Sequence, residues 1–241
     1  MLNDFDAIPA RQRVIVALDC GAPEALALAD ALTGHATWLK VGMTLYYAEG
    51  PSIVSALKRR GFKVFLDLKF HDIPHQVAGA TASAVRSGAD MITLHTVGGV
   101  PMMVAAQKSA QSVAAQEGKK APITLGITVL TSMDAEALGA TGVGRSVADQ
   151  VAALAAQAQA AGLSGVVASP QEAALLRAVL GRAAFIVTPG VRPAGADVGD
   201  QSRVATPARA FEAGASHIVI GRPITQAADP VAAFETIVKG L

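Results

Sequence analysis

Short runs of apolar, often β-branched residues alternate along the whole chain with Ala- and Leu-rich stretches of helical spacing. Eight apolar runs predict strands at residues 14–19, 37–42, 63–70, 91–96, 124–130, 165–169, 185–190 and 217–222. The clearest predicted helices between them cover residues 23–32, 53–60, 147–161 and 171–180. Because the strands are continuously apolar and helices separate them, the pattern predicts a parallel sheet covered by helices.

The number of predicted strands favours one architecture. Eight strand–helix units in 241 residues match a (β/α)8 barrel, which we predict as a single domain over residues 1–241. A doubly wound open sheet is the alternative, but the first strand ends in Leu18-Asp19-Cys20-Gly21 and lacks the glycine-rich turn of dinucleotide folds. Residues 189–206 have no apolar period, which favours a binding loop or lid; a disordered surface insertion is the alternative.

Composition narrows the classes of partner. The 20 Lys and Arg nearly cancel the 19 Asp and Glu, so a formal charge of +1 provides no basic surface for nucleic acid or for an anionic membrane. Residues 150–171 carry no charge, but glutamines, glycines and a serine interrupt them, so we expect no membrane span. The single Cys20 and the acidic start of the chain are consistent with the cytoplasm.

Charged residues gather at the ends of the first three predicted strands, where barrel enzymes place their sites. They are Asp19, Lys40, Asp67 and Lys69, followed just beyond the third strand by Asp72. Asp67 and Lys69 are two residues apart, so they share one face of a strand, which we expect to be the barrel mouth. Opposite charges at ~4 Å attract by on the order of 4 kcal/mol at a dielectric of about 20 and keep each other ionised. A purely structural ion-pair network is the alternative.

The later predicted strands end in groups that suit an anion. Loops after strands seven and eight commonly hold phosphate in barrels. Gly221 allows a close approach of its N–H to an anion, and the Arg222 guanidinium fits phosphate oxygens, although a surface salt bridge is the plainer role. We therefore expect a phosphate monoester in the ligand. Further polar candidates are Thr131 and Ser132 after the fifth strand, and Arg192 and Gln201 in the long loop.

The five histidines do not predict a metal site. His71 and His75 would share a helix face, but Pro74 between them disfavours a helix that spans both. His95 and His217 fall within predicted strands, where a packed imidazole is commoner than a ligand. We expect no catalytic metal.

The string D-L-K-F-H-D-I-P at residues 67–74 resembles the orotidine 5'-phosphate decarboxylases in their shorter bacterial form. Related phosphosugar decarboxylases and synthases share D-x-K-x-x-D, so this string alone is only moderately specific. The likeness extends over nearly the whole chain, and the motifs in their order are highly specific. They include V-A-L-D ending at Asp19, L-K-V-G around Lys40, T-V-L-T-S-M-D at 128–134, V-T-P-G-V-R-P at 187–193, G-D-Q at 199–201 and V-I-G-R-P-I-T at 219–225.

The resemblance implies decarboxylation of orotidine monophosphate (OMP) to uridine monophosphate (UMP), without cofactor or metal, as the last step of de novo pyrimidine nucleotide synthesis. It implies a homodimer with active sites at the subunit interface. Lys69 would donate the proton, Asp67 and Lys40 would complete the charged array, and Asp72 would reach in from the partner subunit.

The resemblance also assigns substrate contacts. Asp19 and Lys40 would hold ribose hydroxyls, Ser132 would contact the pyrimidine edge, and Thr131 would line the site. Gln201 would link base and phosphate, and the phosphate end would be served by Arg192, Gly221 and Arg222. The chain departs from the family after residues 72–74, where bacterial members commonly have Asn-Thr and this chain has His75-Gln76. Gln76 would replace the ribose contact that the threonine makes in those members. Ile73 is a further expected substrate contact.

Physical chemistry supports the reaction that the resemblance implies. Loss of CO2 from pyrimidine C6 leaves an electron pair in an in-plane orbital that the ring cannot delocalise, so a fixed ammonium is the natural stabiliser. One rival is a sugar-phosphate decarboxylase that uses magnesium, but it is expected to have a carboxylate at Lys40, and lysine cannot bind magnesium. The other is a non-catalytic sensor of phosphoribosyl ligands, which the intact set of Asp67, Lys69 and Asp72 disfavours.

Overall fold

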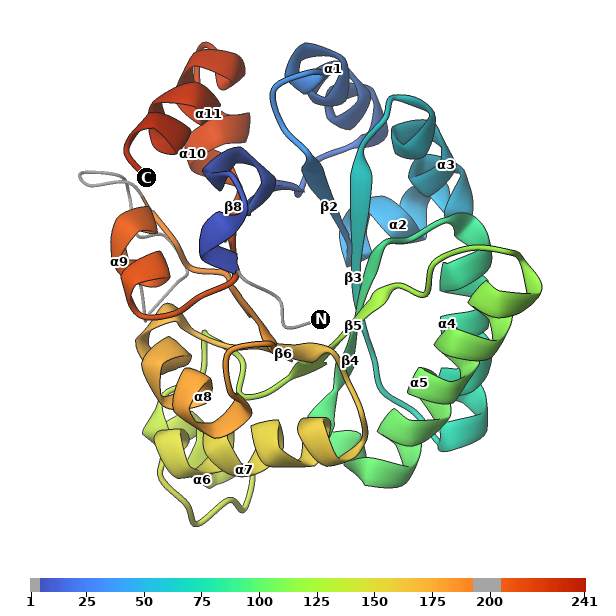
Figure 1. Cartoon of the computed structure of the whole chain (residues 1–241), viewed down its shortest axis with the longest axis vertical. Helices are drawn as coiled ribbons and strands as arrows, with labels where there is room; N and C mark the ends of the chain where they lie inside the picture. The colour runs from blue at the N-terminus through green and yellow to red at the C-terminus, as the bar shows by residue number, and fades with distance from the viewer. Residues whose placement is uncertain (1–4, 193–204) are drawn as a thin grey trace.

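A computed structural model describes residues 5–192 and 205–241 of the chain. Its strands form a closed parallel barrel in sequence order, so the predicted (β/α)8 class is confirmed (Figure 1). The barrel closes because β8 pairs with β1, which excludes the open-sheet alternative. The strands are β1 (Val14–Leu18), β2 (Trp38–Gly42), β3 (Lys63–Phe70), β4 (Met91–His95), β5 (Ile123–Ile127), β6 (Gly165–Val167), β7 (Phe185–Thr188) and β8 (His217–Ile220).

Helices surround the barrel and fill the connections between the strands (Figure 1). The α-helices are α1 (Ala22–Leu32), α2 (Met43–Glu49), α3 (Pro51–Arg59), α4 (Pro74–Ser87), α5 (Gly99–Gln116), α6 (Ala135–Ala140), α7 (Val147–Ala160), α8 (Ala173–Leu180), α9 (Pro207–Glu212), α10 (Arg222–Thr225) and α11 (Pro230–Lys239). Short 3-10 turns are η1 (Phe5–Ala7), η2 (Ala10–Gln12), η3 (Thr96–Gly98) and η4 (Pro170–Glu172). None of the helices in the described part of the chain is long and apolar enough to cross a membrane.

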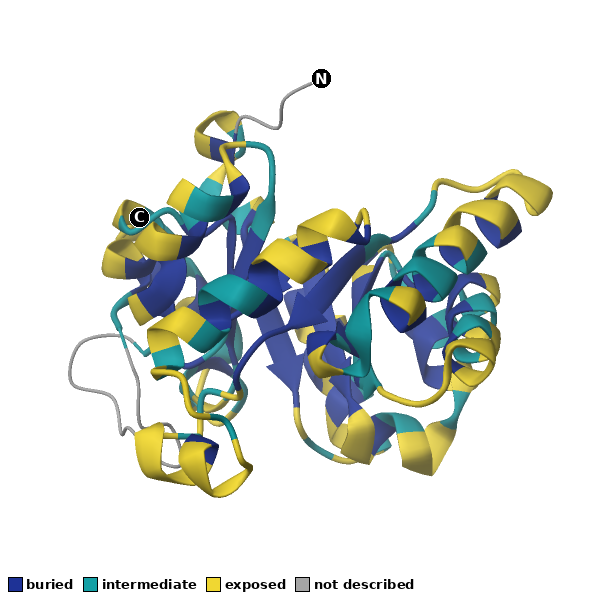
Figure 2. Cartoon of the chain, turned by 90° about the horizontal axis from the view of Figure 1, so that it is seen from below, coloured by how far each residue is buried: buried dark blue, intermediate teal, exposed yellow. Residues whose placement is uncertain are grey.

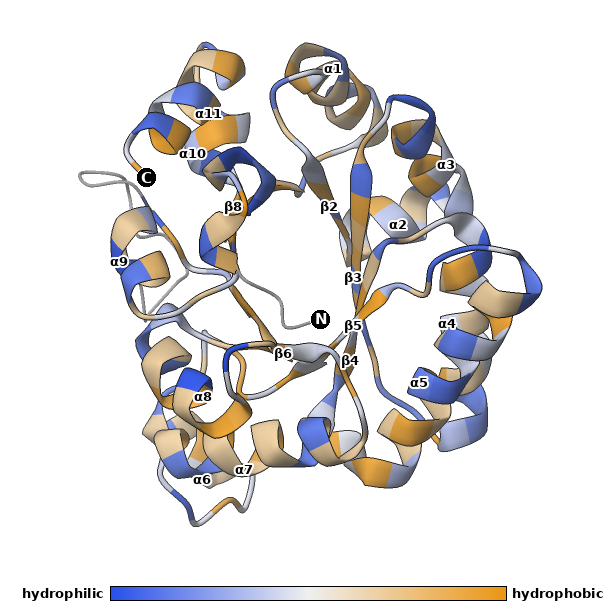
Figure 3. Ribbon diagram, in the orientation of Figure 1, coloured by the Kyte–Doolittle hydropathy of each residue, from blue (hydrophilic) through white to orange (hydrophobic). Residues whose placement is uncertain are grey.

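Alternation along each strand divides the core into two layers. Outward residues such as Val16, Leu39 and Leu66 pack beneath the helices. Inward residues fill the barrel itself, and they include Ile15, Ala17, Trp38, Phe65, Met91, Leu125, Val187 and Val219. Both faces of the sheet are thus buried, which explains the continuously apolar strands. Figure 2 shows the buried strands between helices with exposed outer surfaces, and Figure 3 shows hydrophobic and hydrophilic residues side by side on those helices.

Aromatic side chains close the amino end of the barrel. His217 is 3% exposed, and its ring stacks on Phe185 at a centroid distance of 5.6 Å. The rings of Phe5 and Trp38 meet it edge-on at 6.2 and 5.9 Å. His217 and His95 both lie in strands, as predicted, and His217 is a packed core residue.

The pairing of β3 with β4 is interrupted by a bulge. Leu66 pairs with Ile92 and Phe70 with Leu94, so β3 takes four residue steps where β4 takes two. Lys69 lies in this bulge with a φ of 53°, and it is the one non-glycine residue with positive φ in the described part of the chain. Bulges commonly redirect side chains next to active sites.

Candidate active site

A cavity of about 680 Å³ opens at the carboxyl ends of the strands. This is the end where barrel enzymes place their chemistry. Most of the predicted site residues line the cavity, namely Asp19, Lys40, Asp67, Lys69, Thr131, Arg192, Gly221 and Arg222. The fold therefore brings together residues of β2 and β3 with residues that follow β1, β5, β7 and β8.

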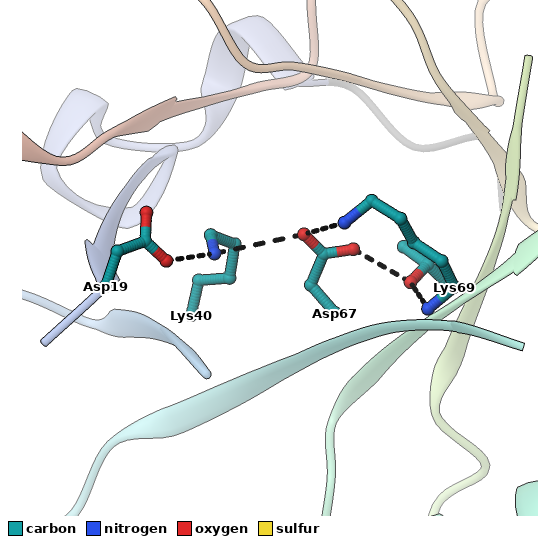
Figure 4. A network of polar contacts seen from close by, with 5 residues as sticks. Asp19, Lys40, Asp67 and Lys69 are labelled. Atoms are coloured by element: carbon teal, nitrogen blue, oxygen red, sulfur yellow. Dashed lines mark hydrogen bonds and ion pairs between the residues drawn. The ribbon is translucent and has the colours of Figure 1, made fainter. Parts of the chain in front are cut away.

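Four of these residues form a row of alternating charge across the mouth (Figure 4). Lys40 Nζ donates a hydrogen bond to Asp19 Oδ1 at 2.9 Å and lies 3.9 Å from Asp67 Oδ2. Lys69 Nζ donates to the same Asp67 oxygen at 3.0 Å. The side chains of Lys40 and Asp67 are only 10% and 13% exposed. Charges this far from water need the partners that they find here, because burial of an unpaired ion is costly.

The position of Lys69 depends on the bulge in β3. Alternation alone predicts that Asp67 and Lys69 face the mouth, and both do line the cavity. However, Lys69 reaches it with left-handed backbone, which the sequence did not indicate. Thr93 of β4 holds this backbone: its hydroxyl accepts a hydrogen bond from Lys69 N–H and donates one to Asp67 Oδ1, both at 2.9 Å. Sequence reasoning missed Thr93, although it is a polar residue at an inward position of an aliphatic strand.

The part of the cavity that follows β7 and β8 carries the predicted anion-binding groups. Gly221 precedes α10, and Arg222 is the first residue of that helix. Arg192 is half-buried, and its backbone N–H donates to the carbonyl of Ala205 at 3.0 Å. A bridge between Val191 and Ala205 thus joins the two ends of the predicted lid. Gln201 and most of the 189–206 loop lie outside the described residues.

Four predicted contacts do not line the cavity of the single chain: Asp72, Ile73, Gln76 and Ser132. All four are exposed. The Asp72 carboxylate accepts a hydrogen bond from Ile73 N–H at 2.6 Å, and within the described chain no ion pair joins it to Lys69. For Asp72 the expectation itself is a role at the partner subunit's site, which the single chain does not test.

Cys20 and Glu24 also line the cavity, and sequence reasoning did not assign either of them. Burial raises the pKa of the Cys20 thiol to about 11, and the nearby Glu24 and Asp19 carboxylates add to the effect. Cys20 is therefore a neutral thiol at physiological pH.

The positions of His71 and His75 agree with the prediction that no helix spans both of them. α4 begins at Pro74, so His75 lies in the helix and His71 lies before it. His71 and His95 contact each other with ring centroids 5.4 Å apart. Burial, followed by the neighbouring His71 and Lys69, lowers the pKa of His95 below its usual range. Among the described residues, no group of three or more His, Cys, Asp or Glu could hold a metal ion.

The fold and the cavity define a barrel enzyme with a charged mouth. Comparison with known proteins identifies its family: the sequence profile of the orotidine 5'-phosphate decarboxylase / HUMPS family matches residues 12–237. The chain belongs to this family.

Relatives cover almost the whole chain. The orotidine 5'-phosphate decarboxylase of Moorella thermoacetica is 49% identical over 240 residues, which are 98% of this chain and 94% of that protein. The enzyme of Synechococcus sp. (strain WH7803) is 50% identical over 92% of each chain. The crystal structure of the Lactobacillus acidophilus orotidine 5'-phosphate decarboxylase superimposes with a TM-score of 0.84 at 37% identity, covering 95% of this chain and 98% of that one.

Proposed function

We propose that the chain decarboxylates OMP to UMP and CO2 through a carbanion-like species at C6, with Lys69 as the proton donor. The reaction is that of the family, whose members named above are orotidine 5'-phosphate decarboxylases. One observation carries the assignment of roles: Lys69 Nζ, held 3.0 Å from Asp67, lines the same cavity as Arg222 and Gly221.

In the proposed reaction the bond between C6 and the carboxylate breaks and its electron pair stays on C6. The Lys69 ammonium stabilises this pair electrostatically and then transfers a proton to it. Lys69 becomes a neutral amine and regains a proton from solvent. Asp67 holds the ammonium in place, and Lys40 on the other side of Asp67 balances the charge of that carboxylate.

The phosphate end is proposed to supply binding energy far from C6. Gly221, Arg222 and Arg192 line the side of the cavity that follows β7 and β8. Binding energy from a remote group can be used to close a loop and exclude water from the reacting centre. In this proposal the 189–206 segment and Gln201 grip the phosphate and the base, while Asp19 and Lys40 hold the ribose.

Lys40 argues against the rival function of a sugar-phosphate decarboxylase that uses magnesium. Magnesium prefers oxygen ligands. Lys40 instead places an ammonium between the carboxylates of Asp19 and Asp67. This arrangement supports a reaction that relies on the fixed charges of the chain.

The mechanism is tested by measuring the absorbance change of OMP with wild-type protein and Lys69→Ala. We expect turnover by the wild type, also in excess chelator, and no detectable product with Lys69→Ala while its far-UV circular dichroism is unchanged. Substantial residual activity of the variant would remove Lys69 from its role. A wild-type rate that vanishes with chelator would favour the metal-dependent alternative.

We further propose a homodimer in which Asp72 of each chain completes the site of its partner. Large apolar side chains are exposed just beyond three adjacent strands: Met43 and Tyr47 after β2, Ile73 after β3 and Val97 after β4. Apolar surface of this kind is typical of interfaces. Asp72 and Gln76 share this surface, so a second copy placed there supplies the contacts that the single chain lacks. Thr131 lines the cavity of the single chain, and Ser132 at the same rim would reach the base.

Mixed dimers test the shared site. Lys69→Ala and Asp72→Ala should each be inactive alone. After the two are unfolded and refolded together, random pairing in a two-fold dimer leaves one intact site in each mixed dimer, roughly a quarter of the wild-type sites. No recovered activity would show that Asp72 does not act across the interface.

The near-neutral charge supports a small-molecule substrate without nucleic acid or membrane partners. The free Cys20 is consistent with the proposed cytoplasmic location.

A further inference from the structure

We propose that Thr93 is a positioning residue for the decarboxylation, which acts by orienting Asp67 and by holding the backbone of Lys69. The inference rests on the proposed roles of those two residues. Thr93 lies in the middle of β4 on the inward face, directly opposite the bulge in β3, and is fully buried.

The Thr93 hydroxyl determines how the Asp67 carboxylate is turned. A hydroxyl has a single proton to donate. Thr93 gives that proton to Asp67 Oδ1 at 2.9 Å. The other oxygen, Oδ2, then faces Lys69 Nζ at 3.0 Å and Lys40 Nζ at 3.9 Å (Figure 4). Thr93 thus binds one carboxylate oxygen of Asp67, and the other oxygen contacts the two lysines.

The same hydroxyl also holds the backbone of Lys69. The bulge removes regular pairing between Leu66 and Phe70, and the Lys69 N–H finds its partner in Thr93 Oγ1 at 2.9 Å. Lys69 has a φ of 53°, which residues with a β-carbon avoid unless their surroundings hold them there. The Thr93 side chain therefore holds both the carboxylate of Asp67 and the backbone of Lys69.

Loss of the hydroxyl should affect the chemical step and spare binding. Without it, the Asp67 carboxylate is free to rotate and the Lys69 ammonium loses its fixed position relative to C6. The phosphate-end groups Gly221 and Arg222 follow β8, which is separated from β3 by β1 and β2. A change confined to the transition state lowers kcat without raising KM.

The experiment compares side chains with and without the hydroxyl. Thr93→Val keeps the volume and removes the hydroxyl, whereas Thr93→Ser keeps the hydroxyl. Thr124→Val is the matched control, because Thr124 in β5 is equally buried and its hydroxyl donates to Gln107 Oε1 at 2.6 Å, outside the residues that line the cavity. kcat and KM for OMP are measured for each variant, together with circular dichroism and the midpoint of thermal unfolding.

We expect Thr93→Val to lose on the order of 10²-fold in kcat, comparable to the effect of a misplacement of about 1 Å, with KM for OMP unchanged. Thr93→Ser should restore most of the rate. Thr124→Val should lower the thermal midpoint and keep the wild-type kcat. Should Thr93→Val not fold, Thr93→Ala and Thr93→Ser give the same comparison of side chains with and without the hydroxyl.

Two results would overturn the inference: a wild-type kcat for the variants that lack the hydroxyl, or a loss in Thr93→Ser as large as in Thr93→Val. Failure of the proposed function is separate, because then the wild-type protein itself would not convert OMP. Inactive Lys69→Ala beside fully active Thr93→Val would refute the role of Thr93 alone.

Discussion

The buried imidazole of His217 predicts a loss of stability in mild acid. Burial lowers its pKa from 6.5 to about 3, and the nearby Arg13 and Lys63 contribute to the lowering. Between pH 6.5 and pH 3 the imidazole binds a proton in the unfolded chain but not in the folded chain. The contribution of His217 to the free energy of unfolding is therefore fully present above pH 6.5 and is lost as the pH falls toward 3. At 1.36 kcal/mol for each pH unit, this one group costs about 2 kcal/mol at pH 5 and about 5 kcal/mol below pH 3.

Urea unfolding at pH 7 and pH 5 measures this contribution. His217→Phe removes the titrating group and retains an aromatic ring against Trp38 and Phe185. We expect the free energy of unfolding of the wild type to fall by about 2 kcal/mol more than that of His217→Phe between the two pH values. His75→Gln, which removes an exposed imidazole, is the matched control. An equal fall in the wild type and His217→Phe would refute the argument, whatever the stability of the variant at pH 7.

Two further predictions concern the walls of the cavity. Arg222→Ala should reduce turnover of OMP far more than turnover of the phosphate-free nucleoside, because the arginine is proposed to bind only the phosphate; equal losses in kcat/KM on both substrates would contradict that role. Cys20 should react slowly with iodoacetamide at pH 8, because a pKa raised from 9.0 to about 11 leaves roughly 100-fold fewer thiolates than an ordinary thiol has. Mass spectrometry would detect faster alkylation in urea, and equal rates in the folded and unfolded protein would be evidence against the raised pKa.

The fold could be predicted because each strand carries its own local signal. The apolar runs and helical spacings along the chain suffice to count the strand–helix units. The ends of the strands are less well predicted: the fifth was expected at 124–130, and the structure gives Ile123–Ile127. Thr128 and Val129 continue the apolar pattern because they are buried. They extend past the end of the paired strand, since burial and ladder pairing are separate requirements.

The candidate site could be predicted where a residue lies in a strand or follows the carboxyl end of one. Asp19 directly follows β1, Lys40 and Asp67 lie in β2 and β3, and the barrel brings these strands together at the cavity. The left-handed backbone of Lys69 depends instead on the register between β3 and β4, which no local pattern reveals. Asp72 lies outside the cavity of the single chain, and its proposed role requires a partner subunit that no local pattern in the sequence describes.

The register of the barrel also explains why the charges can stand so close together. β2 pairs Gly42 with Asp67, so the residue beside the Asp67 carboxylate has no side chain. A β-carbon at Gly42 would lie 3.1 Å from both Asp19 Oδ1 and Lys40 Nζ, closer than ordinary van der Waals contact. The hydrogen-bonded side chains of Asp19 and Lys40 therefore lie next to the space that a side chain at position 42 would enter. A side chain at position 42 would push the Asp19–Lys40 pair aside by a few tenths of an ångström, so glycine in β2 suits this close arrangement of charges.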